Sequence, residues 1–205
     1  MKTVFSQEPL TWSGPAVFLA GPTLRARTEP CGEYYASARA LCPRCGGTGM
    51  VRLRSWREDA LEIMADEAFQ TVYRRLLEIM SALPAEDVTV IVPEFRDWCE
   101  WTATDIASGK AQVDWEDAAM ERAGTLMFWV PRDMRRLPGL TTNVEYGFYL
   151  AQRPHDIVLG FPPDAVHVQY FLDKAERRLG RPIKHYNTLR ETCLAALQHA
   201  QEGRR

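Results

Sequence analysis

Two glutamates in the second half of the chain have the residue type and setting of a catalytic carboxylate pair. Glu145 lies in the stretch "TTNVEYGF", and Glu116 lies in "QVDWEDAAM". At a glycosidic bond, one carboxylate can attack the sugar while a second handles the proton of the leaving group. The two segments are therefore candidates for the two halves of one active site.

Each of these acids also has a purely structural explanation. Thr142 and Glu145 have the spacing of a capping box, in which Thr142 caps a helix and Glu145 bonds back to the backbone. Glu116 and its neighbour Asp117 fit a solvated helix face. We expect Glu145 in the first turn of its helix, where the helix dipole would keep it ionised, as a nucleophile requires.

Short apolar runs bounded by Gly and Pro alternate with amphipathic segments along the chain. The apolar runs predict strands at 16–23, 87–95, 125–131, 156–163 and, more weakly, 182–188. The amphipathic spacing predicts helices at 55–83, 113–123, 141–152, 167–180 and 189–201. This alternation predicts an α/β protein, with a doubly wound sheet of about five parallel strands and helices on both faces. Ligands of such sheets bind beyond the carboxyl ends of the strands, where the helix of Glu145 would begin.

Composition limits the remaining possibilities. The chain has 205 residues, 46% hydrophobic and 25% charged, which suits a single domain over residues 1–205 with one sizeable core. A net charge of −2 argues against binding of a nucleic-acid polymer. The chain lacks a membrane-length apolar run, a dinucleotide fingerprint and a P-loop, and its odd number of five cysteines is untypical of a disulfide framework. We expect a soluble, cytoplasmic protein.

An insertion at about 24–54 is rich in cysteine and arginine. Seven arginines in residues 24–57 face only two glutamates, which fits either a phosphate-bearing partner or a solvated basic loop. The stretch "CPRCGGTGM" resembles a zinc knuckle, and Cys31, Cys42 and Cys45 are three candidate ligands. Structural zinc normally takes four. Cys99 or a partner chain would have to complete the site, so zinc and a metal-free lid or partner-binding segment both stay open.

The order of five motifs resembles the nucleoside 2-deoxyribosyltransferase-like family. The motifs are "VFLAGPT", "SWREDAL", "VIVPEF", "QVDWEDAAMERAGTLMFWVPR" and "PGLTTNVEYGF". The resemblance implies a flavodoxin-like fold and cleavage or exchange of the N-glycosidic bond of (deoxy)nucleosides or their monophosphates. It places the family's nucleophile on Glu145 and the acid that contacts the nucleobase on Glu116, with Asp117 as the alternative.

The resemblance also implies where the substrate lies. The turn Gly21-Pro22-Thr23 would line the pocket, Trp115 could stack on the base, and the loop 96–112 with its two tryptophans could cover it. Classical members carry an aspartate six residues before the nucleophile, whereas this chain has Gly139. Thr141, Thr142 and Asn143 are then the candidates for polar contacts with the sugar.

Two functions of different classes follow. The first is an enzyme without a cofactor for its chemistry, which forms a covalent sugar–Glu145 intermediate and passes the sugar to a second nucleobase or to water. Its partners would be a nucleoside or nucleotide and a free nucleobase, and by analogy we expect a homo-oligomer. The second is a non-catalytic module that uses the same fold to bind or sense a nucleotide.

Overall fold

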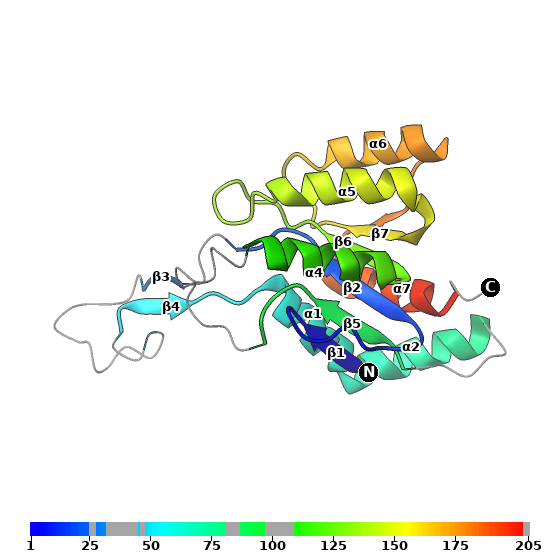
Figure 1. The fold of residues 1–205 in the computed structure, drawn as a ribbon, viewed down its shortest axis with the longest axis horizontal. Helices are drawn as coiled ribbons and strands as arrows, with labels where there is room; N and C mark the ends of the chain where they lie inside the picture. Colours follow the sequence, from blue (N-terminus) through cyan, green and yellow to red (C-terminus); the bar gives the residue numbers. More distant parts are fainter. Residues whose placement is uncertain (25–27, 32–44, 46–47, 81–86, 97–108, 203–205) are drawn as a thin grey trace.

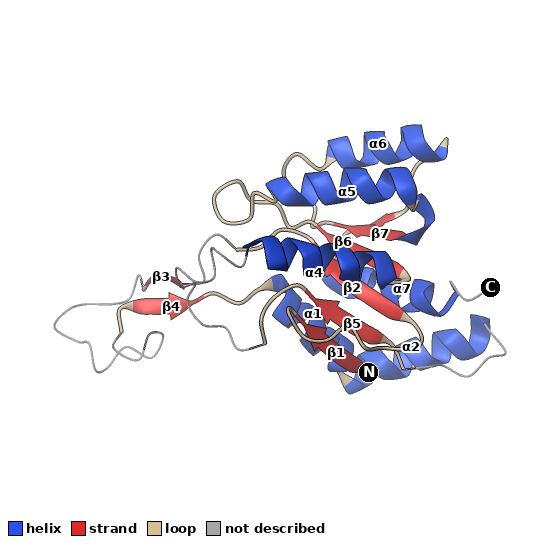
Figure 2. Ribbon diagram, in the orientation of Figure 1, coloured by secondary structure: helices blue, strands red, loops and turns tan. Residues whose placement is uncertain are grey.

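Six parallel strands form the central sheet of the protein (Figures 1 and 2). The structure is a computed structural model, and it describes residues 1–24, 28–31, 45, 48–80, 87–96 and 109–202. The strands lie in the order β1 (Lys2–Phe5), β5 (Thr89–Val92), β2 (Ala16–Ala20), β6 (Thr125–Trp129), β7 (Ile157–Gly160) and β8 (His185–Tyr186).

The predicted α/β architecture is confirmed, with one strand more than expected. All five predicted strands are present and parallel. The additional strand, β1, pairs with β5 at the edge of the sheet. Its sequence gives a weak signal because only Val4 of its four residues is buried. Without β1, the strand order is that of a flavodoxin-like sheet, and the switch point lies between β2 and β6.

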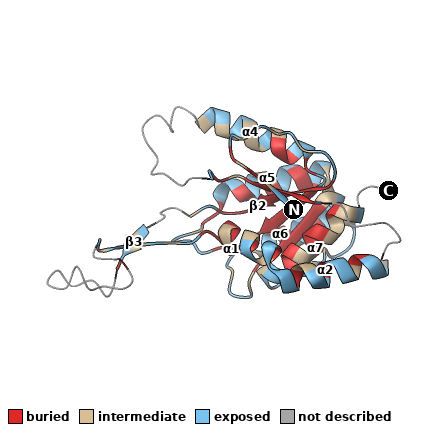
Figure 3. Cartoon of the chain, turned by 90° about the horizontal axis from the view of Figure 1, so that it is seen from below, coloured by how far each residue is buried: buried red, intermediate tan, exposed pale blue. Residues whose placement is uncertain are grey.

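Helices cover both faces of the sheet because the strand side chains alternate between two apolar layers. Val17 and Leu19 of β2 pack with α1 (Trp56–Ala65), α2 (Glu67–Met80) and α7 (Leu189–Glu202). Phe18 and Ala20 pack on the other face with α4 (Gly109–Arg122), α5 (Leu140–Gln152) and α6 (Gln169–Leu179). A short 3-10 helix, η2 (Pro154–Asp156), leads into β7. Figure 3 shows the buried residues gathered in the strands and on the inner sides of the helices.

The predicted helix at 55–83 is two helices. Asp66 ends α1 in an extended conformation, and its side chain accepts a hydrogen bond from the backbone N–H of Phe69 in the first turn of α2. A carboxylate that competes for backbone N–H groups in this way favours a helix boundary over a helix interior. The helix predicted at 113–123 begins four residues earlier, at Gly109.

The insertion contains a small antiparallel sheet of β3 (Thr28–Pro30) and β4 (Met50–Arg52). Figure 1 shows this pair at one end of the molecule, away from the central sheet. Arg136, in the loop between β6 and α5, forms an ion pair with Glu29 of β3 at 2.6 Å. The two-stranded sheet is thereby tied to the loop that leads into the helix of Glu145. None of the helices in the described residues is long and apolar enough to cross a membrane.

Candidate active site

The turn after β2 approaches two neighbouring elements so closely that it requires glycine. Gly21 has a φ of +148°, and a Cβ there would lie 2.2 Å from the backbone oxygen of Trp129. The carbonyl of the next residue, Pro22, accepts a hydrogen bond from the indole N–H of Trp56 at 2.8 Å. The turn therefore joins the ends of β2 and β6 to the start of α1, at the switch point of the sheet.

Arg57 is buried beneath this turn, although its position near the start of α1 fits an exposed residue. A capping box of Ser55 and Glu58 begins the helix, so that Arg57 turns inward. Its guanidinium donates to the backbone oxygens of Leu19 and Gly21. It also forms a buried ion pair with Glu94, 2.9 Å away at the end of β5. A fixed positive charge thus lies under the carboxyl ends of β2 and β5.

Glu116 is half-buried on the face of α4 that is turned toward this charge. Burial raises the pKa of Glu116, while a hydrogen bond from Gln112 and the positive charge of Arg57 lower it. Asp117, which is exposed, raises it slightly further. Of the two adjacent acids, Glu116 is therefore the one in the less solvated environment, and its assignment over Asp117 stays a prediction.

Glu145 is half-buried on α5 and lies within the electrostatic reach of Glu116. Burial raises the pKa of Glu145 to about 7, and the negative charge of Glu116 contributes to the rise. Arg57 opposes the rise, and Asp117 adds to it. Burial and a like charge therefore oppose the ionisation that the helix dipole was expected to maintain.

The predicted capping box at Thr142 and Glu145 is also wrong. Helix α5 begins at Leu140 after Gly139, which has a left-handed φ of 59° and makes no side-chain cap. Glu145 is consequently in the second turn, where its side chain is not needed to cap the helix. Thr142 is fully buried, and its hydroxyl has no hydrogen-bond partner among the described residues.

The other predicted substrate-binding residues lie around this pair in different ways. Thr23 accepts a hydrogen bond from Arg57 at 3.2 Å, which places its hydroxyl over the buried charge. Trp115 donates its indole N–H to the backbone oxygen of Glu8 and packs on the core beside the N-terminal segment. Its ring is thus held by protein, and stacking on a base stays a prediction. Asn143 lies on the α6 side of α5, where it accepts from Arg132 at 2.6 Å.

Gly139 occupies the position at which the resemblance implies an aspartate. A Cβ at this residue would lie 3.0 Å from the Cβ of Pro22 and 3.3 Å from the hydroxyl of Thr142. The left-handed backbone and this close contact both favour glycine. Pro22 therefore packs directly on the start of α5, and this contact fixes the helix of Glu145 against the turn after β2.

Arg132, which follows β6, was not predicted as part of the site. It is 6% exposed and donates hydrogen bonds to Asn143 and to the backbone oxygens of Gly139 and His167. The guanidinium of Arg132 also lies over the ring of Phe171 of α6, in a cation–π contact. These contacts hold the start of α5 between β6 and α6, so Arg132 positions the helix rather than the carboxylates themselves.

The cysteines of the insertion lie together as far as the structure describes them. Cys31 and Cys45 are buried in one small cluster on which Val51 packs. Cys42 and Cys99 fall outside the described residues, as do Trp98, Trp101 and most of the predicted covering loop. Within the described part, no three His, Cys, Asp or Glu side chains form a metal-binding group. Structural zinc at Cys31, Cys42 and Cys45 stays a prediction.

Part of the basic character of the insertion is neutralised by its surroundings. Arg52 pairs with Glu58, and Arg54 pairs with Asp59 and with a second acid of α1. The local excess of arginine is therefore weaker evidence for a phosphate-bearing partner than the sequence alone indicates. Four of the seven arginines fall outside the described residues: Arg25, Arg27, Arg39 and Arg44.

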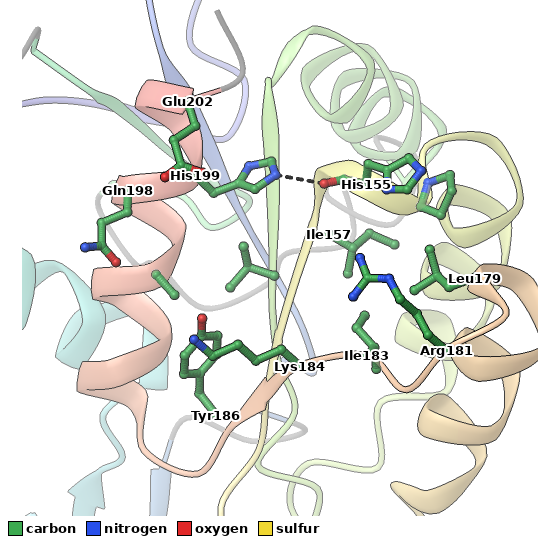
Figure 4. A pocket seen from close by; sticks show the side chains of 13 residues that line it. His155, Ile157, Leu179, Arg181, Ile183, Lys184, Tyr186, Gln198, His199 and Glu202 are labelled. Atoms are coloured by element: carbon green, nitrogen blue, oxygen red, sulfur yellow. Dashed lines mark hydrogen bonds between the residues drawn. The ribbon is translucent and has the colours of Figure 1, made fainter. Parts of the chain in front are cut away.

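Two further pockets lie away from the carboxylate pair. One, of about 320 Å³, lies beside β7 and β8 and is also lined by residues of α7 (Figure 4). His199 lines this pocket. Its ring forms hydrogen bonds with the backbone oxygen of His155 at 2.7 Å and with the hydroxyl of Thr125 at 2.8 Å. Both ring nitrogens of His199 are engaged, which agrees with a structural role. The other, of about 510 Å³, lies between α5 and α6 and is lined by Asn143.

The geometry defines a class of protein: a flavodoxin-like α/β fold with a coupled carboxylate pair at its switch point. A family model described as nucleoside 2-deoxyribosyltransferase like matches residues 45–164, more than half of the chain. The chain belongs to this family, as predicted. The matched residues include Glu116 and Glu145 but not the turn after β2. No curated protein sequence matches the chain. The expected homo-oligomer stays a prediction.

Proposed function

We propose that the protein cleaves the N-glycosidic bond of a nucleoside or nucleotide through a covalent sugar–Glu145 intermediate. The observation that supports this is the coupled pair of carboxylates. Burial raises the pKa of both carboxyls, and the negative charge of Glu116 adds to the rise at Glu145, so it is costly to ionise both groups together. One carboxylate is then available as a nucleophile and the other as an acid.

Each step of the proposed reaction uses these two groups. The reactive form is the one in which Glu145 is ionised and the proton is on Glu116. In this form Glu145 attacks the anomeric carbon and forms an ester, while the electron pair of the N-glycosidic bond passes to the base. Glu116 gives its proton to the departing base. In the second step an incoming base or water attacks the same carbon and gives its proton to Glu116, and the Glu145 carboxylate leaves. The configuration at the anomeric carbon is retained.

We propose base exchange rather than hydrolysis as the usual second step. Family membership supports this, and the weaker case for a phosphate-binding insertion removes one argument against it. The test is to mix a purine deoxynucleoside with a different free base and to follow the products by mass. A new nucleoside is the expected product. Free sugar formed at one rate, with or without the second base, would instead identify a hydrolase.

Glu116→Ala should slow base release most for poor leaving groups and least for activated ones. The reason is that a general acid matters most when the departing base needs protonation. The measurement is the rate of free-base release over a series of nucleosides with bases of different basicity. Asp117→Asn is the matched control, since it removes the adjacent exposed carboxylate of the same helix. A larger effect at Asp117 would contradict the assignment of Glu116.

The alternative is a non-catalytic module that binds a nucleotide without cleaving it. The glycine at position 139 supports this alternative, because the aspartate of the family pattern is missing from the site. The same panel of nucleosides and monophosphates distinguishes the two functions. Binding without release of free base from any member of the panel would favour the module and overturn the enzyme.

A further inference from the structure

Glu116 is held by a residue one turn earlier on its own helix. The side-chain nitrogen of Gln112 donates to Oε1 of Glu116 at 2.6 Å. Both side chains are half-buried, so the bond is partly protected from competing water. No partner of the second oxygen, Oε2, is found among the described residues.

The orientation of the Gln112 amide is fixed from the N-terminal strand. The turn that follows β1 donates two hydrogen bonds to Oε1 of Gln112, one from the hydroxyl of Ser6 and one from the side-chain nitrogen of Gln7 at 3.1 Å. The nitrogen of Gln7 also donates to the backbone oxygen of Ala111 at 3.3 Å. A flipped Gln112 amide would lose both incoming bonds and would turn its oxygen toward Glu116.

The turn itself is held in an unusual conformation. Gln7 has a φ of 65°, in the left-handed region that residues other than glycine rarely adopt. Ser6, which is 4% exposed, donates its backbone N–H to the backbone oxygen of Glu94 at 3.0 Å. That residue is the ion-pair partner of Arg57. The turn is thus anchored in the charged centre of the site, and the anchoring maintains a strained backbone beside α4.

We propose that Gln112 is a positioning residue, and that with the Ser6–Gln7 turn it determines which oxygen of Glu116 carries the transferable proton. Oε1 always faces an N–H donor, so it remains an acceptor. The proton can then occupy only Oε2, from which it passes to the departing base. This inference rests on the proposed role of Glu116, and it makes the N-terminal strand part of the active site.

The charges around Glu116 come from three helices. Arg57 faces it from α1, Asp117 is its neighbour on α4, and Glu145 is the second acid on α5. None of these donates a hydrogen bond to Glu116 among the described contacts. Gln112 therefore has no replacement as the donor to Oε1 within the described residues.

The test is Gln112→Met, which keeps the length of the side chain but removes the donor. We expect base release to fall by about tenfold or more for poor leaving groups, the usual cost of one lost charge-assisted bond, and to change little for activated ones. The loss of the bond should also raise the pKa of Glu116, as followed by carboxyl-carbon NMR with Glu116→Gln as the assignment control. Ser6→Ala should shift both quantities in the same direction by less.

Gln169→Met is the matched control, because Gln169 donates to Asp173 four residues later on the exposed side of α6. Equal effects at Gln112 and Gln169, or a uniform loss over all leaving groups, would overturn the positioning role. A leaving-group effect at Glu116 without one at Gln112 would overturn only this inference. The absence of base release by the wild type would overturn the proposed function, while the NMR titration would still decide whether Gln112 sets the state of Glu116. Should Gln112→Met fail to fold, Ser6→Ala alone decides between the outcomes.

Discussion

Replacing Glu145 by glutamine should abolish release of free base while leaving nucleoside binding largely intact. Removal of a nucleophile typically costs on the order of 10³-fold or more in rate, because the amide cannot form the ester with the sugar. Base release and ligand binding should be measured on the same preparation. Near wild-type turnover by Glu145→Gln would exclude this residue as the nucleophile.

The same variant should be more resistant to heat than the wild type above neutral pH. The pKa of Glu145 is about 7 in the folded protein, against an ordinary value of 4.5. A raised carboxyl pKa means that the folded state loses stability as the pH rises from about 4.5 to about 7, and the full penalty is present at pH 8. Glutamine does not ionise, so its advantage in melting temperature should be larger at pH 8 than at pH 5. Glu121→Gln, which removes an exposed carboxylate of α4, is the control and should show no such difference.

Arg57→Met should cause a large loss of stability. The substitution leaves the Glu94 carboxylate, which is 8% exposed, without its buried cation, and it removes the donor to the backbone oxygens of Leu19 and Gly21. Breaking a buried ion pair from one side costs about 3–5 kcal/mol. Denaturant unfolding measures the loss. Arg54→Met is the control, since its ion pairs are exposed to solvent and should contribute little to stability.

The loss of Arg57 should also alter the pH dependence of the reaction. Its positive charge lowers the pKa of both Glu116 and Glu145. In Arg57→Met, ionisation of Glu145 should require a higher pH. The acid limb of the pH–rate profile should therefore shift to higher pH. Glu116→Gln should have the opposite effect, because it removes a negative charge that raises the pKa of Glu145. Parallel shifts in the two variants would contradict this electrostatic arrangement.

The sheet could be predicted because its central strands are apolar at nearly every position. In β2 and β5 all residues are buried, so the pattern of a strand covered on both faces is complete. The edge strand β1 was missed because a strand with one covered side needs few apolar residues. The boundary at Asp66 was missed because the amphipathic stripe continues across it, whereas the extended backbone of Asp66 and its hydrogen bond to the next helix separate α1 from α2.

The two candidate catalytic acids could be identified from residue type and motif order, but their environment could not. The start of α5 depends on the left-handed backbone conformation of Gly139, which the sequence around Thr142 does not predict. The burial of Arg57 depends on acceptors from β2 and β5, which are far apart in sequence. The sequence gives no signal for Gln112, since Ser6 and Gln7 lie in the turn after a strand that the sequence does not indicate.

The charges that act on Glu145 come from both sides of the sheet. Glu116 belongs to the layer of α4, α5 and α6, whereas Arg57 belongs to the layer of α1, α2 and α7 and reaches around the end of β2. The pKa of Glu145 therefore depends on how the two helix layers are positioned relative to each other. A change of packing in the α1 layer, for example at Met64, should then shift the pH optimum of the reaction. The pH dependence of the reaction would thus report how the two helix layers are aligned in this protein.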